Sequence, residues 1–152
     1  MPLRTANTID TGVISNGDFL GLNGWAFVGA PENRFHPHSG NTEHGSVILT
    51  SNDAITQTLS VATGQVYEFS LVCIGSADVT ITLNSSDLGT NYVYTHNCGS
   101  STWTPFTIEF FLPIDVYTLQ VSHEGFASQT ARVDDISLLE LRSGNTFDSG
   151  LV

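Results

Sequence analysis

Side chains alternate between apolar and polar over long stretches of this chain, and no other feature restricts the possible folds more. Four segments show the alternation most clearly: 66–74, 78–83, 103–112 and 115–122. A period of two places successive side chains on opposite faces of an extended strand, so each strand buries one face and exposes the other. Half-buried strands of this kind are typical of two antiparallel sheets packed face to face.

The alternating pattern predicts most of the secondary structure. Strands are predicted at 45–50, 54–61, 66–74, 78–83, 91–96, 103–112, 115–122 and 132–141, and Val13–Ile14 is predicted to begin the first strand. No segment keeps a 3.6-residue period without β-branched residues or turn breakers, so no substantial helix is expected. Strands spaced by about 8–12 residues indicate an all-β, antiparallel β-sandwich of two packed sheets, a jelly roll.

A chain of 152 residues is long enough for one domain with a single core. Residues 1–12 are polar and aperiodic, which predicts an extended N-terminal arm. The jelly-roll domain is expected to span 13–141, and residues 142–152 are expected to form a C-terminal tail. Within the domain, 29–45 is predicted to be a long surface loop because it contains Pro31, Pro37 and few apolar residues.

The charge balance excludes two classes of partner. The chain contains four arginines and no lysine against fifteen acidic residues, which gives a net charge of −11. Nucleic acids and anionic membrane surfaces both require clustered basic residues, so neither is an expected partner. The sequence also shows no apolar signal region and no stretch long enough to span a bilayer.

The absence of a signal region predicts a chain that is made and released in a host cytoplasm, or exported without a Sec signal. Two cysteines, Cys73 and Cys98, could form one disulfide. Because a cytoplasm keeps thiols reduced, two free thiols are the prediction and the disulfide is the alternative.

Several motifs resemble those of a known group of domains. They are Asn16-Gly-Asp-Phe19 followed by Gly24-Trp25, the segment from Ala54 to Phe69, Trp103-Thr-Pro-Phe106, and Val133-Asp-Asp-Ile-Ser-Leu138. Together they resemble the jelly-roll carbohydrate-binding modules and the wider galactose-binding-like superfamily, over about residues 13–141. The resemblance implies a jelly roll and a non-catalytic binding role.

Sugar binding uses exposed aromatic rings bordered by polar side chains. The candidate ligand-binding residues are Tyr92, Tyr94, Trp25 and Asn91, with Trp103 as a further aromatic candidate. Tyr92 and Tyr94 share one face of their strand, which is expected to point outward, whereas Val93 is expected to face the core. Outward positions are also expected for three further strand residues: Gln57, Glu109 and Phe111.

The resemblance implies neighbouring first and last strands, which would bring Asp18 close to Asp135. In the resembling family an acidic residue often follows the Asn-Gly-x-Phe motif and contributes to a structural calcium site, but Leu20 stands there in this chain. Calcium is usually bound by six to eight oxygen ligands, and this chain lacks the acidic ligand expected after the motif. We therefore predict no metal or other cofactor, and we expect Asp18 to cap a turn. Three histidines, His36, His38 and His44, lie close together in the sequence and could suggest a transition-metal site. They are instead expected on a solvent-exposed loop.

No catalytic residue is predicted, because the carboxylates are scattered over strand exteriors and no nucleophile or phosphate-binding motif occurs. We therefore expect a non-enzymatic binding or structural module. The main hypothesis is a protein of the virion surface, such as a phage capsid decoration (cement) protein. Its polar arms would contact a capsid or particle protein and other copies of itself, and a trimer would suit a capsid threefold axis. The alternative hypothesis is a free-standing, lectin-like module that binds cell-surface glycans through exposed aromatics.

Overall fold

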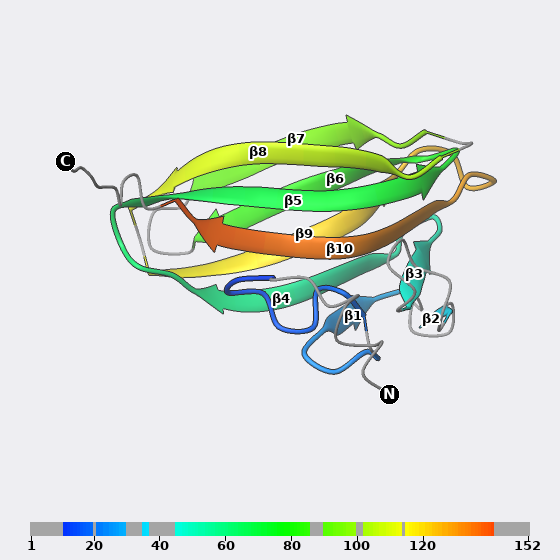
Figure 1. Ribbon diagram of the computed structural model, residues 1–152. Coiled ribbons are helices and arrows are strands. Elements are labelled where there is room, and N and C mark those ends of the chain that lie inside the picture. The colour runs from blue at the N-terminus through cyan, green and yellow to red at the C-terminus, as the bar shows by residue number, and fades with distance from the viewer. Residues whose placement is uncertain are drawn as a thin grey trace.

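The computed structural model describes residues 11–19, 21–29, 35–36, 45–85, 90–99, 102–113 and 115–141. Within these residues the chain forms ten strands and no helix, and the strands lie in two packed antiparallel sheets (Figure 1). The strands are β1 (Ala26–Val28), β2 (Phe35–His36), β3 (Ser46–Leu49), β4 (Ala54–Ser60), β5 (Gln65–Gly75), β6 (Asp78–Ser85), β7 (Thr90–Asn97), β8 (Thr104–Leu112), β9 (Val116–Glu124) and β10 (Ala131–Glu140). The predicted jelly-roll β-sandwich is confirmed.

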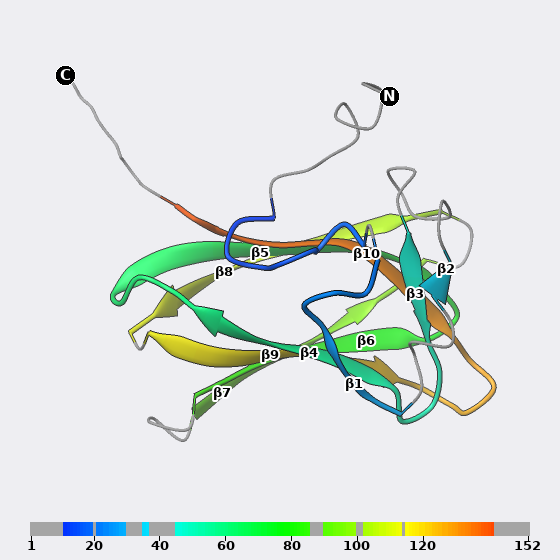
Figure 2. The ribbon, with the colours of Figure 1, turned by 90° about the horizontal axis from the view of Figure 1, so that it is seen from below.

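The two sheets have five strands each. Sheet A has the order β2-β3-β10-β5-β8, and sheet B has the order β1-β4-β9-β6-β7. Figure 2 shows the sandwich from the side, with β10, β5 and β8 in one layer and β4, β9, β6 and β7 in the other. Alternate side chains of both sheets fill the space between the layers, as the sequence pattern predicts.

All the predicted strands except the first are found, with ends that differ by at most two residues. The strand predicted to begin at Val13 is wrong. Instead, the N-terminal segment runs along the edge of β10, where Val13 N donates to Leu138 O (3.1 Å) and Leu138 N donates to Thr11 O (3.1 Å). Gly12 and Leu138 form a single parallel bridge there. The segment therefore covers the half of β10 that β3 does not reach, since β3 pairs with residues 131–133 alone.

Two short strands, β1 and β2, were not predicted. β2 falls inside the predicted surface loop 29–45, most of which lies outside the described residues, and Phe35 of β2 packs against the core. The predicted arm and tail also lie outside the described residues, apart from the last residues of the arm. No helix in the described part of the chain is long and apolar enough to cross a membrane.

Cys73 and Cys98 form a disulfide, so the prediction of free thiols is wrong. Cys73 lies near the end of β5 and Cys98 follows β7, so the bond joins sheet A to the chain leaving sheet B. Gly75 N donates to Gly99 O (2.9 Å), and this pairing holds the two cysteines with their Cα atoms 5.4 Å apart. That separation is within the ordinary range for a disulfide, and such bonds persist in oxidising surroundings.

Candidate functional site

The outward surface of sheet B is built mainly from uncharged polar side chains, together with the apolar side chain of Val93. We call it the polar face and define it as Thr56, Thr58, Thr80, Thr82, Asn84, Val93, Thr95, Thr118, Gln120 and Ser122. These residues alternate with core residues on β4, β9, β6 and β7, so strand geometry alone places them on one side of the sheet. All of them are exposed or half-buried.

The strand register aligns these side chains in rows across the sheet. In the central row, Thr56 lies opposite Gln120, Gln120 opposite Thr82, and Thr82 opposite Val93. In the next row, Ser122, Thr80 and Thr95 are neighbours, and the hydroxyls of Thr80 and Thr95 lie 3.0 Å apart in a hydrogen bond. The result is a grid of hydroxyl and amide groups that can each donate and accept hydrogen bonds.

Among the described strand residues of sheet B, the charged side chains on this surface lie at one end. Asp78 lies opposite Glu124 on β9 and opposite Asn97 on β7, and Asn97 Nδ2 donates to Asp78 Oδ1 (2.8 Å). No enclosed pocket occurs among the described residues. A ligand on the polar face would therefore lie across an open surface and would meet hydroxyl and amide groups.

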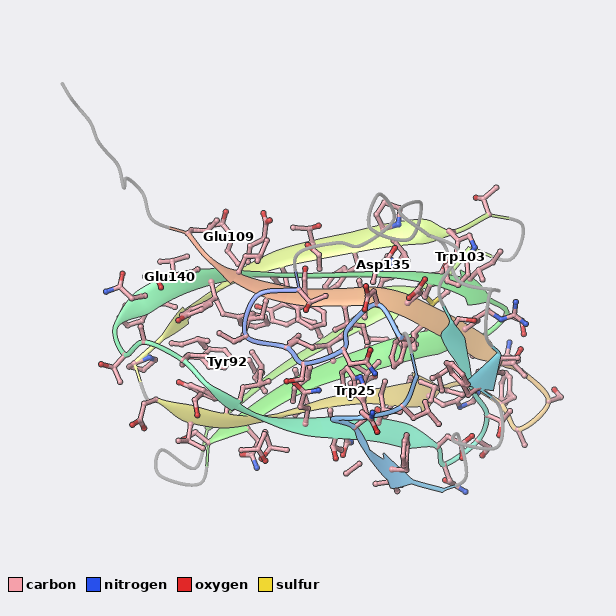
Figure 3. All side chains as sticks on the ribbon, turned by 60° about the horizontal axis from the view of Figure 1, so that its bottom comes forward. Trp25, Tyr92, Trp103, Glu109, Asp135 and Glu140 are labelled. Carbon is pink, nitrogen blue, oxygen red and sulfur yellow. A yellow bond between two sulfur atoms is a disulfide. The ribbon has the colours of Figure 1, made fainter. Side chains whose placement is uncertain are left out.

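The predicted outward orientation of Tyr92 and Tyr94 is wrong. Tyr92 lies opposite Leu83 and Tyr94 opposite Ile81, two fully buried core residues, whereas Val93 is 54% exposed. Figure 3 shows Tyr92 between the two sheets. Both tyrosine rings pack edge-on against Phe110 of β8, with centroids 5.3 and 5.7 Å away. Tyr–Val–Tyr is apolar on both sides of the strand, so the local pattern could not show which side faces inward.

This inward packing joins the two sheets along the side where β7 and β8 face each other. The hydroxyl of Tyr92 donates to the backbone carbonyl of Phe111 (3.1 Å), which fixes β7 to β8 directly. Tyr94 is 42% exposed because it lies at the edge of sheet B. The side chain of Asn91 lies outside the described part of the structure, although its backbone pairs with Asn84.

Trp25, another candidate for ligand binding, is buried. It is 7% exposed, its ring stacks on Phe19 at 5.5 Å, and its Nε1 donates to Asn16 O (3.0 Å) (Figure 3). Trp103 is half-buried just before β8. A ligand contact by Tyr92, Tyr94, Trp25 or Asn91 stays a prediction, and Tyr94 is the most exposed of those whose side chains are described.

Gln57 was also expected to point outward, and this is wrong. Its side chain is 8% exposed and fixes the N-terminal segment, because Oε1 accepts from Ser15 N (2.7 Å) and Nε2 donates to Ser15 O (3.0 Å). The sequence carried the signal, since Gln57 lies in phase with the buried residues Ile55 and Leu59. Glu109 and Phe111 do point outward, on β8 of sheet A.

The start and the end of the domain meet as the resemblance implied. Ile136 N donates to Gly17 O (2.9 Å), which brings the neighbouring Asp18 and Asp135 into the same region, and both are buried. Within the described residues, no group of three or more His, Cys, Asp and Glu side chains is placed to hold a metal ion. Calcium at this position stays a possibility raised by the sequence. Among the predicted loop histidines, His38 and His44 and the side chain of His36 lie outside the described part.

One histidine of the described part has an unusual environment. His96 on β7 packs on Phe106 of β8, with ring centroids 4.8 Å apart, and its Nε2 atom is buried without a hydrogen-bond partner. Burial lowers the pKa of His96 below its ordinary value of 6.5, while the carboxylate of Asp78 opposes that shift. A neutral imidazole is therefore part of the contact between the sheets.

No protein-family model and no curated protein sequence matches the chain. Solved structures do match. A family 61 carbohydrate-binding module in complex with β-1,4-galactotriose has a TM-score of 0.69 and 15% identity, over 85% of this chain and 98% of that one. The C-terminal family 22 module of Clostridium thermocellum Xyn10B has a TM-score of 0.65 and 14% identity, over 91% and 100%. The fold is that of the jelly-roll carbohydrate-binding modules.

The same comparison finds the fold within a larger phage protein. The enzymatically active domain of bacteriophage CBA120 tailspike protein 4 has a TM-score of 0.61 and 11% identity, over 86% of this chain and 21% of that one. The predicted resemblance to carbohydrate-binding modules is thus confirmed at the level of the fold. At such low identities the likeness leaves the ligand of this chain open, because one fold serves many functions.

Proposed function

We propose that this chain is a non-catalytic carbohydrate-binding module whose polar face binds a neutral polysaccharide. The observation that carries the proposal is the chemistry of the outward surface of sheet B: over four strands its described side chains are uncharged except for Asp78 and Glu124 at one end, in a chain with a net charge of −11. Sugar hydroxyls are neutral donors and acceptors, and the hydroxyl and amide groups of this face complement them.

The openness of the surface favours a polymer over a small molecule. Small ligands are usually enclosed by a concave pocket, whereas a polysaccharide can lie across several rows of side chains and make many weak contacts. Two solved neighbours support a carbohydrate ligand: one holds β-1,4-galactotriose and another is described as a xylan-binding domain. Tyr94 points toward the core side of β7 but is 42% exposed at the edge of sheet B, so it is the described candidate best able to add an aromatic contact at that edge.

The test compares two pairs of hydroxyls on opposite sides of the sandwich. Thr80 and Thr95 are hydrogen-bonded on the polar face, and Ser70 and Thr107 are hydrogen-bonded (3.2 Å) on the outer face of sheet A. Affinity electrophoresis of the chain in neutral β-linked xylans, glucans and galactans should show retardation. The double variant Thr80→Val/Thr95→Val should lose about tenfold in affinity, since two hydrogen bonds are removed without a change of shape.

The matched control is the double variant Ser70→Ala/Thr107→Val, which should bind as tightly as the parent chain. Equal losses in both double variants would show that the polar face is not the binding surface. If the parent chain is retarded by none of the polysaccharides, the proposed function itself is wrong.

A second candidate role is that of a structural subunit on a virion, such as a capsid decoration protein. The likeness to part of a phage tailspike protein favours it. The test is to add the purified chain to capsids that lack their decoration protein and to measure its uptake. Stoichiometric addition by a chain that binds no polysaccharide would support this role over the first.

A further inference from the structure

The four edge strands of the sandwich differ in how well they are protected. An edge strand presents unpaired backbone N–H and C=O groups, and proteins usually protect such edges against pairing with other chains. The edges of sheet A are β2 and β8, and those of sheet B are β1 and β7. β1 has three residues and β2 has two, so these edges are too short to pair extensively.

β8 is long but protected in three ways. Pro105 lies within it and has no N–H to donate. The carbonyl of Phe111 already accepts the hydroxyl of Tyr92, and Glu109 places an exposed negative charge on the strand. Each of these features discourages another strand from pairing with β8.

β7 has none of these protections. It contains no proline, Asp, Glu, Lys or Arg, and its eight residues pair with β6 from Thr90 to Asn97 without a bulge. Within the described part of the chain β6 is its only strand neighbour. In an antiparallel ladder every second residue turns its N–H and C=O away from the partner, so β7 presents a row of backbone groups that no other described strand pairs with. Val93 and Tyr94, at the middle of the strand, are 54% and 42% exposed.

We propose that β7 pairs with β7 of a second copy of this chain, in antiparallel orientation about a two-fold axis. An antiparallel strand is self-complementary in its backbone hydrogen bonds, which is the requirement for a two-fold interface. Two copies that each carry a net charge of −11 repel each other, and β7 is an edge without charged residues where the repulsion is small. A long edge strand without charged residues, proline or a bulge lacks the features that usually prevent pairing with another chain.

The pairing has a definite geometry. A two-fold axis perpendicular to the sheet joins the two copies of sheet B into one continuous sheet of ten strands. The axis leaves both polar faces on the same side, so they form one surface. Val93 lies near the middle of β7, and the two copies of Val93 come close to each other at the axis. The inference concerns the edge alone and does not rest on the proposed carbohydrate ligand.

Sedimentation velocity over a wide range of concentration tests the pairing. The parent chain should form a species of 32.6 kDa, which is two chains of 16.3 kDa. Val93→Lys places two like charges together at the axis and should give a species of 16.3 kDa. Phe111→Lys is the matched control, because Phe111 is equally exposed (56% against 54%) on the other long edge, β8, and it should remain a dimer.

Amide hydrogen exchange of β7 supplies a second readout that does not depend on a variant. Exchange in residues 90–97 of the parent chain should slow as concentration rises, while exchange in β8 should not change. A parent chain that stays at 16.3 kDa at every concentration would overturn the proposal. An oligomer that survives Val93→Lys, or that Phe111→Lys dissociates equally, would also overturn it. If Val93→Lys fails to fold, as judged by near-ultraviolet circular dichroism, the exchange measurement decides.

Discussion

The outer faces of the two sheets have different chemistry although both are built from the same alternating strands. On sheet A, Glu68 of β5 lies directly opposite Glu109 of β8, and the exposed ring of Phe111 lies opposite Val66. On sheet B, the corresponding rows contain threonine, glutamine, serine, asparagine and one valine, Val93. The inner faces of both sheets share one continuous core. Stability is therefore a property of both sheets together, whereas a surface suited to neutral ligands belongs to sheet B alone.

The largest effect should come from the core that the two faces share. Trp25→Ala removes a buried ring that stacks on Phe19 and donates to Asn16 O, and it should lower the free energy of unfolding by about 4 kcal/mol. Phe126→Ala, at an aromatic residue that is 77% exposed, is the matched control and should change it little. Urea titration measures both. A Trp25→Ala loss as small as that of Phe126→Ala would mean that Trp25 is not part of the core.

The covalent link between the sheets should have the next largest effect. The disulfide joins residues 25 positions apart, and its loss should lower the free energy of unfolding by about 3 kcal/mol through the greater entropy of the unfolded chain. Urea titration with and without reductant measures this change. The double variant Cys73→Ala/Cys98→Ala should respond to reductant not at all. If reductant leaves the parent chain unchanged as well, the two cysteines are not bonded in solution.

Two variants test the chemical difference between the outer faces by adding a carboxylate to sheet B and removing one from sheet A. Gln120→Glu introduces a carboxylate at the centre of the polar face, and a neutral polysaccharide would have to displace its water, so affinity should fall about tenfold. Glu109→Gln is the reverse change on sheet A. It should leave polysaccharide affinity unchanged and raise the free energy of unfolding by a few tenths of a kcal/mol, because it removes a like-charge pair with Glu68. Affinity electrophoresis and urea titration measure the two effects, and a loss of affinity in Glu109→Gln would contradict the assignment to sheet B.

The sequence predicted which side of a strand is buried only where apolar and polar residues alternate clearly along that strand. Tyr67, Phe69 and Leu71 alternate with polar residues, and their strand and its buried side are as predicted. On β7 the run Tyr92–Val93–Tyr94 has no polar member, so only the register with β6 shows that the tyrosines point inward. The registers of several strands, which no single segment encodes, bring the rows of the polar face together.

The disulfide and Gln57 show two other reasons for failure. The cysteine prediction used the expected compartment, whereas the bond depends on the pairing of Gly75 with Gly99, which is set by the fold. Gln57 was placed outward because it is polar, yet its neighbours in phase are buried. Its amide is accepted in the interior because it forms two hydrogen bonds with the backbone of Ser15.

Removing the hydroxyl of Tyr92 tests the contact between the two sheets where β7 faces β8. Tyr92→Phe keeps the ring against Phe110 but leaves the Phe111 carbonyl without its donor, and it should lower the free energy of unfolding by about 1 kcal/mol. Tyr94→Phe is the matched control, at the more exposed ring of the same strand, and should cost less. Equal losses in the two variants would show that the Tyr92 hydrogen bond contributes nothing to this contact.

The smallest effect should be the response of this same contact to pH. Because burial lowers the pKa of His96, the unfolded chain takes up a proton near pH 6.5 while the folded chain does so only at lower pH. The contribution of His96 to the free energy of unfolding is therefore full above pH 6.5 and declines as the pH falls below it. Urea titration at about pH 7.5 and about pH 5.5 should show a larger decline in the parent chain than in His96→Phe. If the free energy of unfolding declines equally in the two chains, the imidazole of His96 protonates in the folded chain as easily as in water. The contact between His96 and Phe106 would then not keep water from the imidazole.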